Sequence, residues 1–298
     1  MPPPVLIFAN PIAGRGAGRT TAERLGARLS REGFDPLLVF DRPAAMTDGQ
    51  LPRDTRAVIV IGGDGTVRGV ASRLLNSFGS AMPPLLIVPM GTANLLARHL
   101  GTVWNEHELA TRVAQAIARL RTVQLDAARA NDELFLLMAG IGLDARVVHE
   151  LDRIRTGPID YTSYALPAAL ALGLYNYPPL TVTLDNETIW NNRPAVAFVG
   201  NVKEYGTGFP ILPHALPSDG LLDICVLPCA NRAEAIRHLM LAAVGEHLSA
   251  EGVVYRQGRH IRIESAADVP IQIDGEAAGH TPLTIELLPV RLPFIVPG

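Results

Sequence analysis

Residues 57–66, AVIVIGGDGT, decide the fold of the first half of this chain. The five apolar residues 57–61, four of them β-branched, predict a buried strand that runs directly into the loop 62–66. Residues 67–75 then have the pattern of a helix. A turn between a strand and a helix does not need the carboxylate of Asp64, so we predict a functional role for this residue, as a metal-associated carboxylate beside phosphates.

The same order of strand, loop and helix recurs on both sides of this stretch. The further predicted strands are 5–9, 37–40 and 85–88, and the further predicted helices are 20–30, a segment ending at Leu100, and 108–120. Alternation of this kind predicts a mostly parallel sheet with helices on both faces. We therefore expect a doubly wound α/β domain over residues 1–122.

After residue 121 short strands separated by turn signals dominate. They predict an antiparallel β-sandwich over residues 123–288, interrupted by helices near 161–174 and 232–245. The predicted strands are 123–128, 134–139, 180–184, 188–191, 195–200, 222–227, 253–256, 260–263, 271–274 and 283–287. A last strand at 291–296 could return to the first domain, so that residues 289–298 would complete it.

Composition excludes several function classes. The chain has 298 residues, a formal net charge of −3 and 48% apolar residues, which argues against disorder and against nucleic-acid binding by bulk charge. Lys203 is the only lysine, so neither a GxxxxGK[ST] loop nor the strand lysine of protein kinases is present. Any phosphate chemistry must use backbone amides, arginine and metal. Two cysteines make no disulfide framework, which fits a reducing cytoplasm.

Three glycine-rich loops follow predicted strands and precede predicted helices: residues 10–18, 62–66 and 89–94. In a parallel sheet they meet at the carboxyl edge, where ligands bind and where helix N-termini offer free N–H groups to phosphate. For each loop taken by itself, the alternative to a phosphate-binding loop is an ordinary turn. The dinucleotide fingerprint is a further alternative, with Asp41 as its ribose ligand, but the Asn-Pro opening of the first loop does not fit it.

Six motifs in order resemble the diacylglycerol kinase catalytic-domain family, which includes bacterial soluble lipid kinases and is similar to sphingosine and ceramide kinases. In the first half these are Asn10-Pro11 with its glycines, Gly62-Gly63-Asp64-Gly65-Thr66 and Gly91-Thr92-Ala93-Asn94. In the second half they are GIGLDA at 140–145, PHALPSDGLLD at 213–223 and DGE at 274–276. The matches span almost the whole chain.

The resemblance implies a two-domain kinase that uses ATP and Mg²⁺ and binds the nucleotide between its domains. The residues expected at the nucleotide are Asn10, Pro11, Gly14, Asp41, Gly62, Gly63, Asp64, Gly65, Thr66, Gly91 and Thr92. Asp64 would hold the catalytic Mg²⁺ indirectly, in a network with Asp126, and either Glu276 or Asp274 would be the general base. Asp219, with the carbonyls of Leu216 and Leu221, would bind a second, structural Mg²⁺.

Some positions depart from the family, and ordinary turns explain some of the matches. Arg68 and Gly69 stand where Asn-Glu is usual, and Leu95 replaces an acidic residue that can help recognise the lipid head group. Asp274-Gly275 and Asp219-Gly220 are also common turn sequences. The departures at Arg68, Gly69 and Leu95 leave the identity of the lipid substrate open. Two other functions stay open as well: an NAD kinase, and a catalytically inactive lipid-binding module.

Residues 161–177, YTSYALPAALALGLYNY, are apolar almost all round. They predict a core helix, the wall of an acyl-chain cleft or a face that rests on a bilayer. No apolar run reaches the roughly 18 residues of a transmembrane helix. We therefore expect a cytoplasmic protein in reversible, peripheral contact with the inner membrane face, with a lipid alcohol and ATP as substrates and no nucleic-acid partner. A homodimer is left open.

Overall fold

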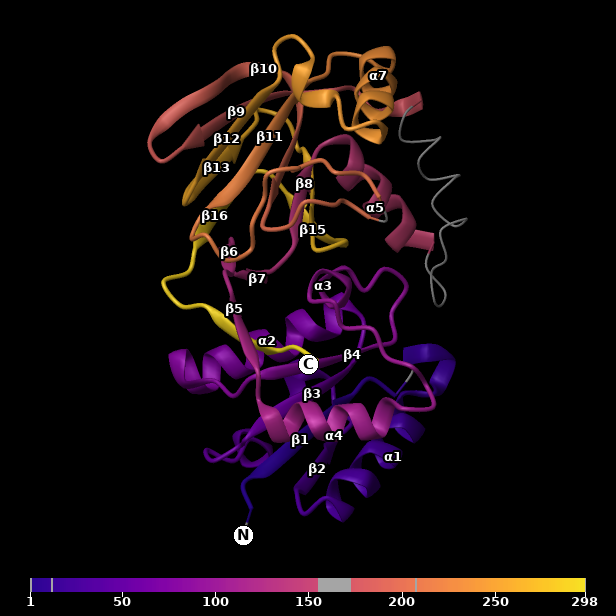
Figure 1. Cartoon of the computed structure of the whole chain (residues 1–298). Helices are drawn as coiled ribbons and strands as arrows, with labels where there is room; N and C mark the ends of the chain where they lie inside the picture. Colours follow the sequence, from indigo (N-terminus) through magenta and orange to yellow (C-terminus); the bar gives the residue numbers. More distant parts are fainter. Residues whose placement is uncertain (1, 12, 155–172, 207, 298) are drawn as a thin grey trace. The chain divides into compact units, whose positions relative to one another are not determined.

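The computed structural model describes residues 2–11, 13–154, 173–206 and 208–297 (Figure 1). It divides the chain into two compact units. Unit 1 comprises Met1–Leu125 with Val290–Gly298, and unit 2 comprises Asp126–Pro289.

Unit 1 is built on a six-stranded sheet in the order β2-β1-β3-β4-β17-β5. Its strands are β1 (Pro4–Ala9), β2 (Asp35–Val39), β3 (Ala57–Gly62), β4 (Leu85–Pro89), β5 (Thr122–Leu125) and β17 (Leu292–Ile295). Strands β1 to β4 are parallel, and β17 from the end of the chain pairs with β4 in parallel and with β5 antiparallel. The end of the chain therefore completes the sheet of its first half.

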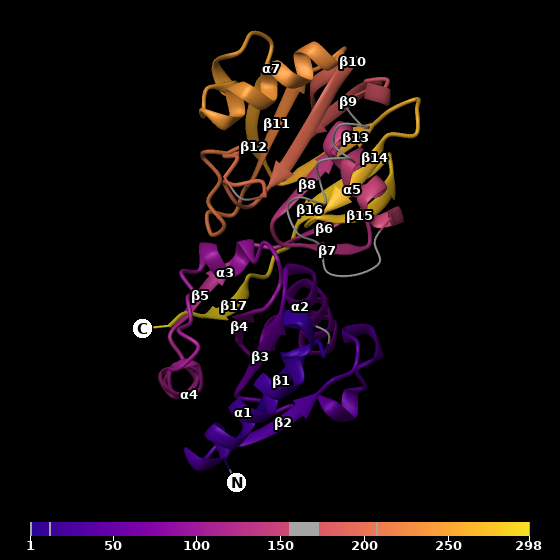
Figure 2. The ribbon, with the colours of Figure 1, turned by 90° about the vertical axis from the view of Figure 1, so that its right-hand side faces the viewer.

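Helices cover both faces of this sheet, as the uninterrupted burial of β1 and β3 requires. The helices are α1 (Gly18–Arg31), α2 (Asp64–Phe78), α3 (Leu95–His99) and α4 (Leu109–Arg119), with short 3₁₀ turns η1 (Ala13–Gly16), η2 (Pro43–Ala45), η3 (Asp48–Gln50) and η4 (Gly79–Ala81). Helices α1 and α4 share one apolar cluster with β1, β3 and β4, and α2 packs on the other face of the sheet (Figures 1 and 2). This is the α/β fold that the alternating pattern predicts.

Unit 2 is one curled, antiparallel sheet of eleven strands. Its strands are β6 (Ala128–Ala130), β7 (Glu133–Phe135), β8 (Met138–Ile141), β9 (Pro179–Leu184), β10 (Glu187–Gly200), β11 (Leu222–Pro228), β12 (Val254–Gly258), β13 (His260–Glu264), β14 (Pro270–Ile273), β15 (Glu276–His280) and β16 (Leu283–Leu287). Helices α5 (Leu143–Ile154) and α7 (Arg232–Ala243) and the 3₁₀ turn η6 (His247–Ser249) join them.

The long strand β10 makes the sheet curl. Its first half pairs with β9 and contains two register irregularities, and its second half pairs with β8 and β11. Apolar side chains from both parts of the sheet then enclose one core, which includes Leu180 and Val182 of β9 and Ala197 of β10. The antiparallel β domain predicted from the short strands is confirmed.

Several local predictions differ from the structure, among them the predicted strand 134–139, which is divided between β7 and β8. The predicted strand 123–128 ends at Leu125, because the chain passes from unit 1 to unit 2 there. The predicted strands 188–191 and 195–200 are one strand, β10, and neither α5 nor β15 was predicted. The predicted helix 161–174 lies outside the described residues, except for its last two. Within the described residues, no helix combines the length and apolarity that crossing a membrane requires.

Candidate functional site

In unit 1 the three predicted loops lie side by side, because they leave the adjacent strands β1, β3 and β4 at the same edge. Main-chain hydrogen bonds join them. The N–H of Asn10 donates to the carbonyl of Ile61 (3.1 Å), and the N–H of Gly14 donates to the carbonyl of Met90 (3.2 Å). The residues of the three glycine motifs are thus brought together at one edge of one sheet.

Glycine is required where the second and third loops touch. A Cβ on Gly91 would lie 2.6 Å from Cα of Gly63, and within the second loop a Cβ on Gly62 would lie 2.6 Å from Cβ of Thr66. Any side chain at Gly91 would push the loops apart. Helix α2 begins here at Asp64, and the first N–H groups of a helix have no partner within it. A cradle of closely spaced main-chain amides suits the phosphates of a nucleotide.

Asp64 fastens the third loop to the second. Its Oδ2 accepts the N–H of Leu95 (3.0 Å) and its Oδ1 accepts the N–H of Leu96 (3.1 Å). Within the third loop, Asn94 accepts the N–H of Gly91 through Oδ1 (2.8 Å) and donates to its carbonyl through Nδ2 (2.7 Å). Burial raises the pKa of Asp64, and these amides counteract that rise. Leu95, which departs from the family pattern, takes part through its backbone.

The structure also explains the departure at Gly69. A Cβ there would lie 3.0 Å from Cγ of Pro43, so glycine lets η2 pack against α2. Arg73 holds the same segment through a hydrogen bond from Nε to the carbonyl of Met46 (2.9 Å). Asp41, predicted at the nucleotide, is exposed and accepts a hydrogen bond from Nε2 of Gln50 (2.7 Å).

In unit 2, Asp126 is buried against the Asp219-Gly220 turn. Its Oδ2 accepts the N–H of Gly220 (2.6 Å), and its own N–H donates to the carbonyl of Pro217 (2.7 Å). From the other side, Nε of Arg259 donates to the carbonyl of Gly220 (3.1 Å). Asp126 thus fixes the turn that carries Asp219.

The surroundings of Asp219 contain the oxygen donors that Mg²⁺ prefers. Its Oδ1 accepts the N–H of Leu221 (3.0 Å), and its N–H makes a long bond to the carbonyl of Leu216 (3.4 Å). Asp223 is buried nearby, where Tyr255 OH (2.5 Å) and Gln257 Nε2 (3.2 Å) donate to it. Burial, and secondarily the charge of Asp219, raise the pKa of Asp223. Exposed Asp219 and adjacent carbonyl oxygens fit a hard cation whose remaining ligands are water.

Among the described residues, no three His, Cys, Asp or Glu side chains are grouped so that they could hold a metal ion. A divalent ion bound by this part of the chain would therefore depend on carbonyl, water or phosphate oxygens. That is the usual situation of Mg²⁺ in sites that bind phosphates.

The two carboxylates proposed as general base have different surroundings. Asp274 accepts three main-chain N–H groups, from Leu137 (2.8 Å) and Met138 (3.1 Å) at Oδ1 and from Leu136 (3.0 Å) at Oδ2. Glu276, at the start of β15, is exposed. Asp274 therefore has a structural task, which leaves Glu276 as the better candidate to receive a proton.

Gln272, which is not among the predicted site residues, links the predicted motifs in unit 2. This fully buried side chain donates through Nε2 to Oδ2 of Asp144 (3.2 Å) and accepts the N–H of Gly275 through Oε1 (2.8 Å). It therefore joins the GIGLDA motif to the turn that precedes Glu276. A polar residue inside the apolar strand IQI was the available signal.

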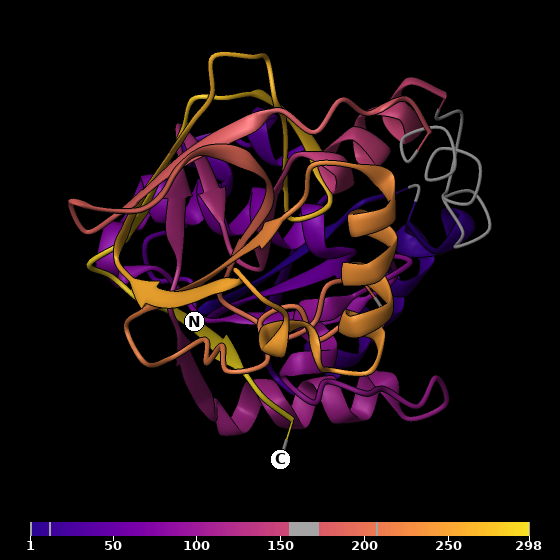
Figure 3. The ribbon, with the colours of Figure 1, turned by 90° about the horizontal axis from the view of Figure 1, so that it is seen from above.

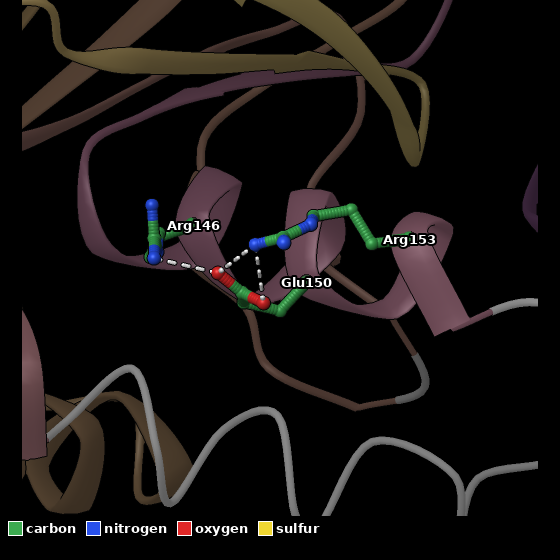
Figure 4. Close-up of polar contacts among 3 residues, drawn as sticks. All are labelled: Arg146, Glu150 and Arg153. Atoms are coloured by element: carbon green, nitrogen blue, oxygen red, sulfur yellow. Dashed lines mark hydrogen bonds and ion pairs between the residues drawn. The ribbon is translucent and has the colours of Figure 1, made fainter.

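Helix α5 directs Asp144 inward. Figure 4 shows its outer face, where Glu150 lies between Arg146 (2.6 Å) and Arg153 (3.4 Å). On the inner face, a Cβ at Gly140 would lie 2.0 Å from Oδ2 of Asp144, so the glycine of the motif makes room for this carboxylate. Burial raises the pKa of Asp144 to about 6, although Tyr205 and Gln272 act to lower it.

This raised pKa predicts a pH-dependent effect of Asp144→Asn. Between pH 3.8 and about 6 the folded chain keeps a proton on Asp144 that the unfolded chain has lost, so stability falls as pH rises. Asparagine carries no such charge and can still accept from Gln272. Across this window we expect the free energy of unfolding of the variant to rise by on the order of 2–3 kcal/mol relative to that of the native chain. Urea unfolding of both proteins over the window measures this, and a difference that does not change with pH contradicts it.

Comparisons with known proteins agree with these motifs. The diacylglycerol kinase catalytic domain matches residues 4–130, and the YegS C-terminal NAD kinase beta sandwich-like domain matches residues 138–296. A diacylglycerol kinase from Mycobacterium tuberculosis is 28% identical over 98% of this chain and 95% of its own length. One from Bacillus subtilis is 23% identical over 93% of this chain and 90% of its own.

A crystal structure of a diacylglycerol kinase from Bacillus anthracis superposes with a TM-score of 0.72 and 26% sequence identity, covering 99% of this chain and 97% of that one. The two family models together span both units, and the second alone matches more than half of the chain. The chain therefore belongs to the kinase family that joins a diacylglycerol kinase catalytic domain to a YegS-type C-terminal domain.

Proposed function

We propose that this chain is an ATP- and Mg²⁺-dependent lipid kinase, which transfers the γ-phosphoryl group to a hydroxyl of diacylglycerol or a related lipid alcohol. The observation that carries the proposal is the joining of the three glycine loops at one sheet edge, with Asp64 fastening two of them. Main-chain amides can replace the lysine of other nucleotide sites, which the sequence lacks at these loops.

In the proposed reaction the lipid hydroxyl oxygen attacks the γ-phosphorus. The bond from that phosphorus to the bridging oxygen breaks, ADP leaves with the bridging oxygen, and Glu276 takes the hydroxyl proton. A carboxylate can accept this proton as the attack proceeds, so its position matters more than a high pKa. Asp274 would hold the turn before Glu276 in place through its three amide contacts. When bound, Mg²⁺ would neutralise phosphate charge.

The roles of the loops also belong to this proposal. Gly14, Gly62, Gly63, Gly65, Thr66, Gly91 and Thr92 would line the triphosphate, with Asn10 and Pro11 shaping the first loop and Asp41 at its periphery. Asp219 with the carbonyls of Leu216 and Leu221 would hold the structural Mg²⁺, and Asp126 would fix their turn. The acceptor lipid would be met at the inner face of the membrane, from the cytoplasm.

Labelled ATP incubated with a panel of acceptors tests the function. The panel contains diacylglycerol, monoacylglycerol and a sphingoid base in mixed micelles, with NAD as a separate acceptor. We expect label in one or more lipids, loss of labelling without Mg²⁺, and none in NAD. Label in NAD alone would favour the NAD kinase alternative, and the absence of Mg·ATP binding by calorimetry would favour an inactive lipid-binding module.

A further inference from the structure

Helix α7 presents large apolar side chains to solvent. Ile236, Leu239 and Met240 are 43%, 49% and 67% exposed, and Val244, directly after the helix, is 70% exposed. In the described part of the chain eight large apolar side chains are exposed, and these are four of them. We call these four residues the α7 stripe. Such a concentration on one helix marks an interaction surface.

The stripe is not needed to hold the helix in place. Its members recur at intervals of three and four residues, so they share one helix face. The opposite face carries Ala235 and Ala242, which pack into an apolar cluster, and His238, which bonds through Nε2 to the carbonyl of Pro228 (2.8 Å). Figure 3 shows α7 on the outside of the curled sheet of unit 2. The helix is thus anchored on one face and apolar on the other.

The exposed charges on α7 itself are two arginines, and one exposed carboxylate, Glu246, lies two residues after Val244. Arg232 and Arg237 are exposed, and neither makes an ion pair with another described residue. The helix has one acidic residue, Glu234, which is turned back onto the helix start. Its Oε2 accepts the N–H of Ala230 (2.7 Å), and its Oε1 accepts Nδ2 of Asn231 (3.1 Å). The outward surface of α7 is therefore apolar and cationic.

We propose that the α7 stripe docks on an anionic phospholipid bilayer, with the helix in the plane of the interface. The apolar side chains would enter the acyl boundary, and both guanidinium groups would contact lipid phosphates. A second copy of this chain fits less well, because pairing the same face would bring the α7 arginines of both copies together, while Glu234 is bound to its own helix start. This proposal rests on the proposed function, because the stripe would contact the membrane from which a lipid acceptor reaches unit 2.

Co-sedimentation of the full chain with phosphatidylcholine vesicles, with and without phosphatidylglycerol, tests the docking. Met240→Glu and Val244→Glu should each lower partitioning onto vesicles roughly tenfold or more. Arg232→Gln and Arg237→Gln should each lower it about fivefold, only where phosphatidylglycerol is present. Val103→Glu is the matched control, because Val103 is 75% exposed in unit 1 and should leave partitioning unchanged.

A second measurement separates this proposal from the kinase proposal. The Met240→Glu/Val244→Glu double variant should phosphorylate a short-chain, water-soluble diacylglycerol at the native rate and a vesicle-borne one much more slowly. If the native chain phosphorylates neither, the kinase proposal fails while the sedimentation result still decides the docking. Native-like sedimentation of the double variant overturns the docking. A native dimer that the double variant abolishes, with vesicle binding unchanged, would instead make the stripe a dimer interface.

Discussion

Replacing Glu276 by glutamine is expected to lower kcat for phosphoryl transfer by about 10²- to 10⁴-fold, the usual contribution of a general base. Glutamine has nearly the same shape but cannot accept the proton of the attacking hydroxyl. Since Glu276 is exposed, the fold should be unchanged. Initial rates at saturating Mg·ATP and lipid measure the effect, with circular dichroism melting as the check on folding.

Two variants make this result specific. Glu251→Gln replaces an exposed glutamate in a turn of the same unit and should keep the native rate. Asp274→Asn replaces one of the two carboxylate oxygens that accept three main-chain N–H groups. We therefore expect the free energy of unfolding to fall by roughly 1–3 kcal/mol. If Glu276→Gln keeps native kcat while Asp274→Asn loses all activity without losing stability, Asp274 is the base and our assignment is wrong.

Replacing Asp64 by alanine is expected to lower kcat/KM for ATP by a hundredfold or more. The carboxylate holds the N–H groups of Leu95 and Leu96, and without it the third loop is no longer fixed to the second. Misplacing a binding group by about 1 Å can cost a factor of about 10² in rate. Steady-state kinetics against ATP, together with calorimetric titration of Mg·ATP, measures the loss.

Hydrogen exchange distinguishes this positioning role from a role in metal binding alone. In Asp64→Ala the amides of Leu95 and Leu96 should exchange faster, while those of helix α4 should not change. Asp64→Asn keeps one acceptor oxygen and should protect one of the two amides. Unchanged exchange at both positions, with ATP binding still lost, would show that Asp64 does not act by fastening this loop.

The sequence by itself determined the order of elements in unit 1 and the position of its three loops. Buried parallel strands appear as short apolar runs, and glycine clusters mark the turns between strand and helix, so both signals are local. The same reasoning found most of the short strands of unit 2. It missed helix α5, the short strand β6 and β15, whose residues are mostly exposed.

Only the tertiary structure decided what the acidic residues do. Asp64 meets its amide partners 31 and 32 positions along the chain, Asp126 meets Gly220 across 94, and Asp274 meets Leu136 across 138. Such partners come together only when strands pair and loops pack. No local sequence pattern could therefore distinguish Asp274, which accepts main-chain N–H groups, from Glu276, which is exposed. The sequence shows Gln272 as a polar residue in an apolar strand, but its two partners are defined only by the folded sheet.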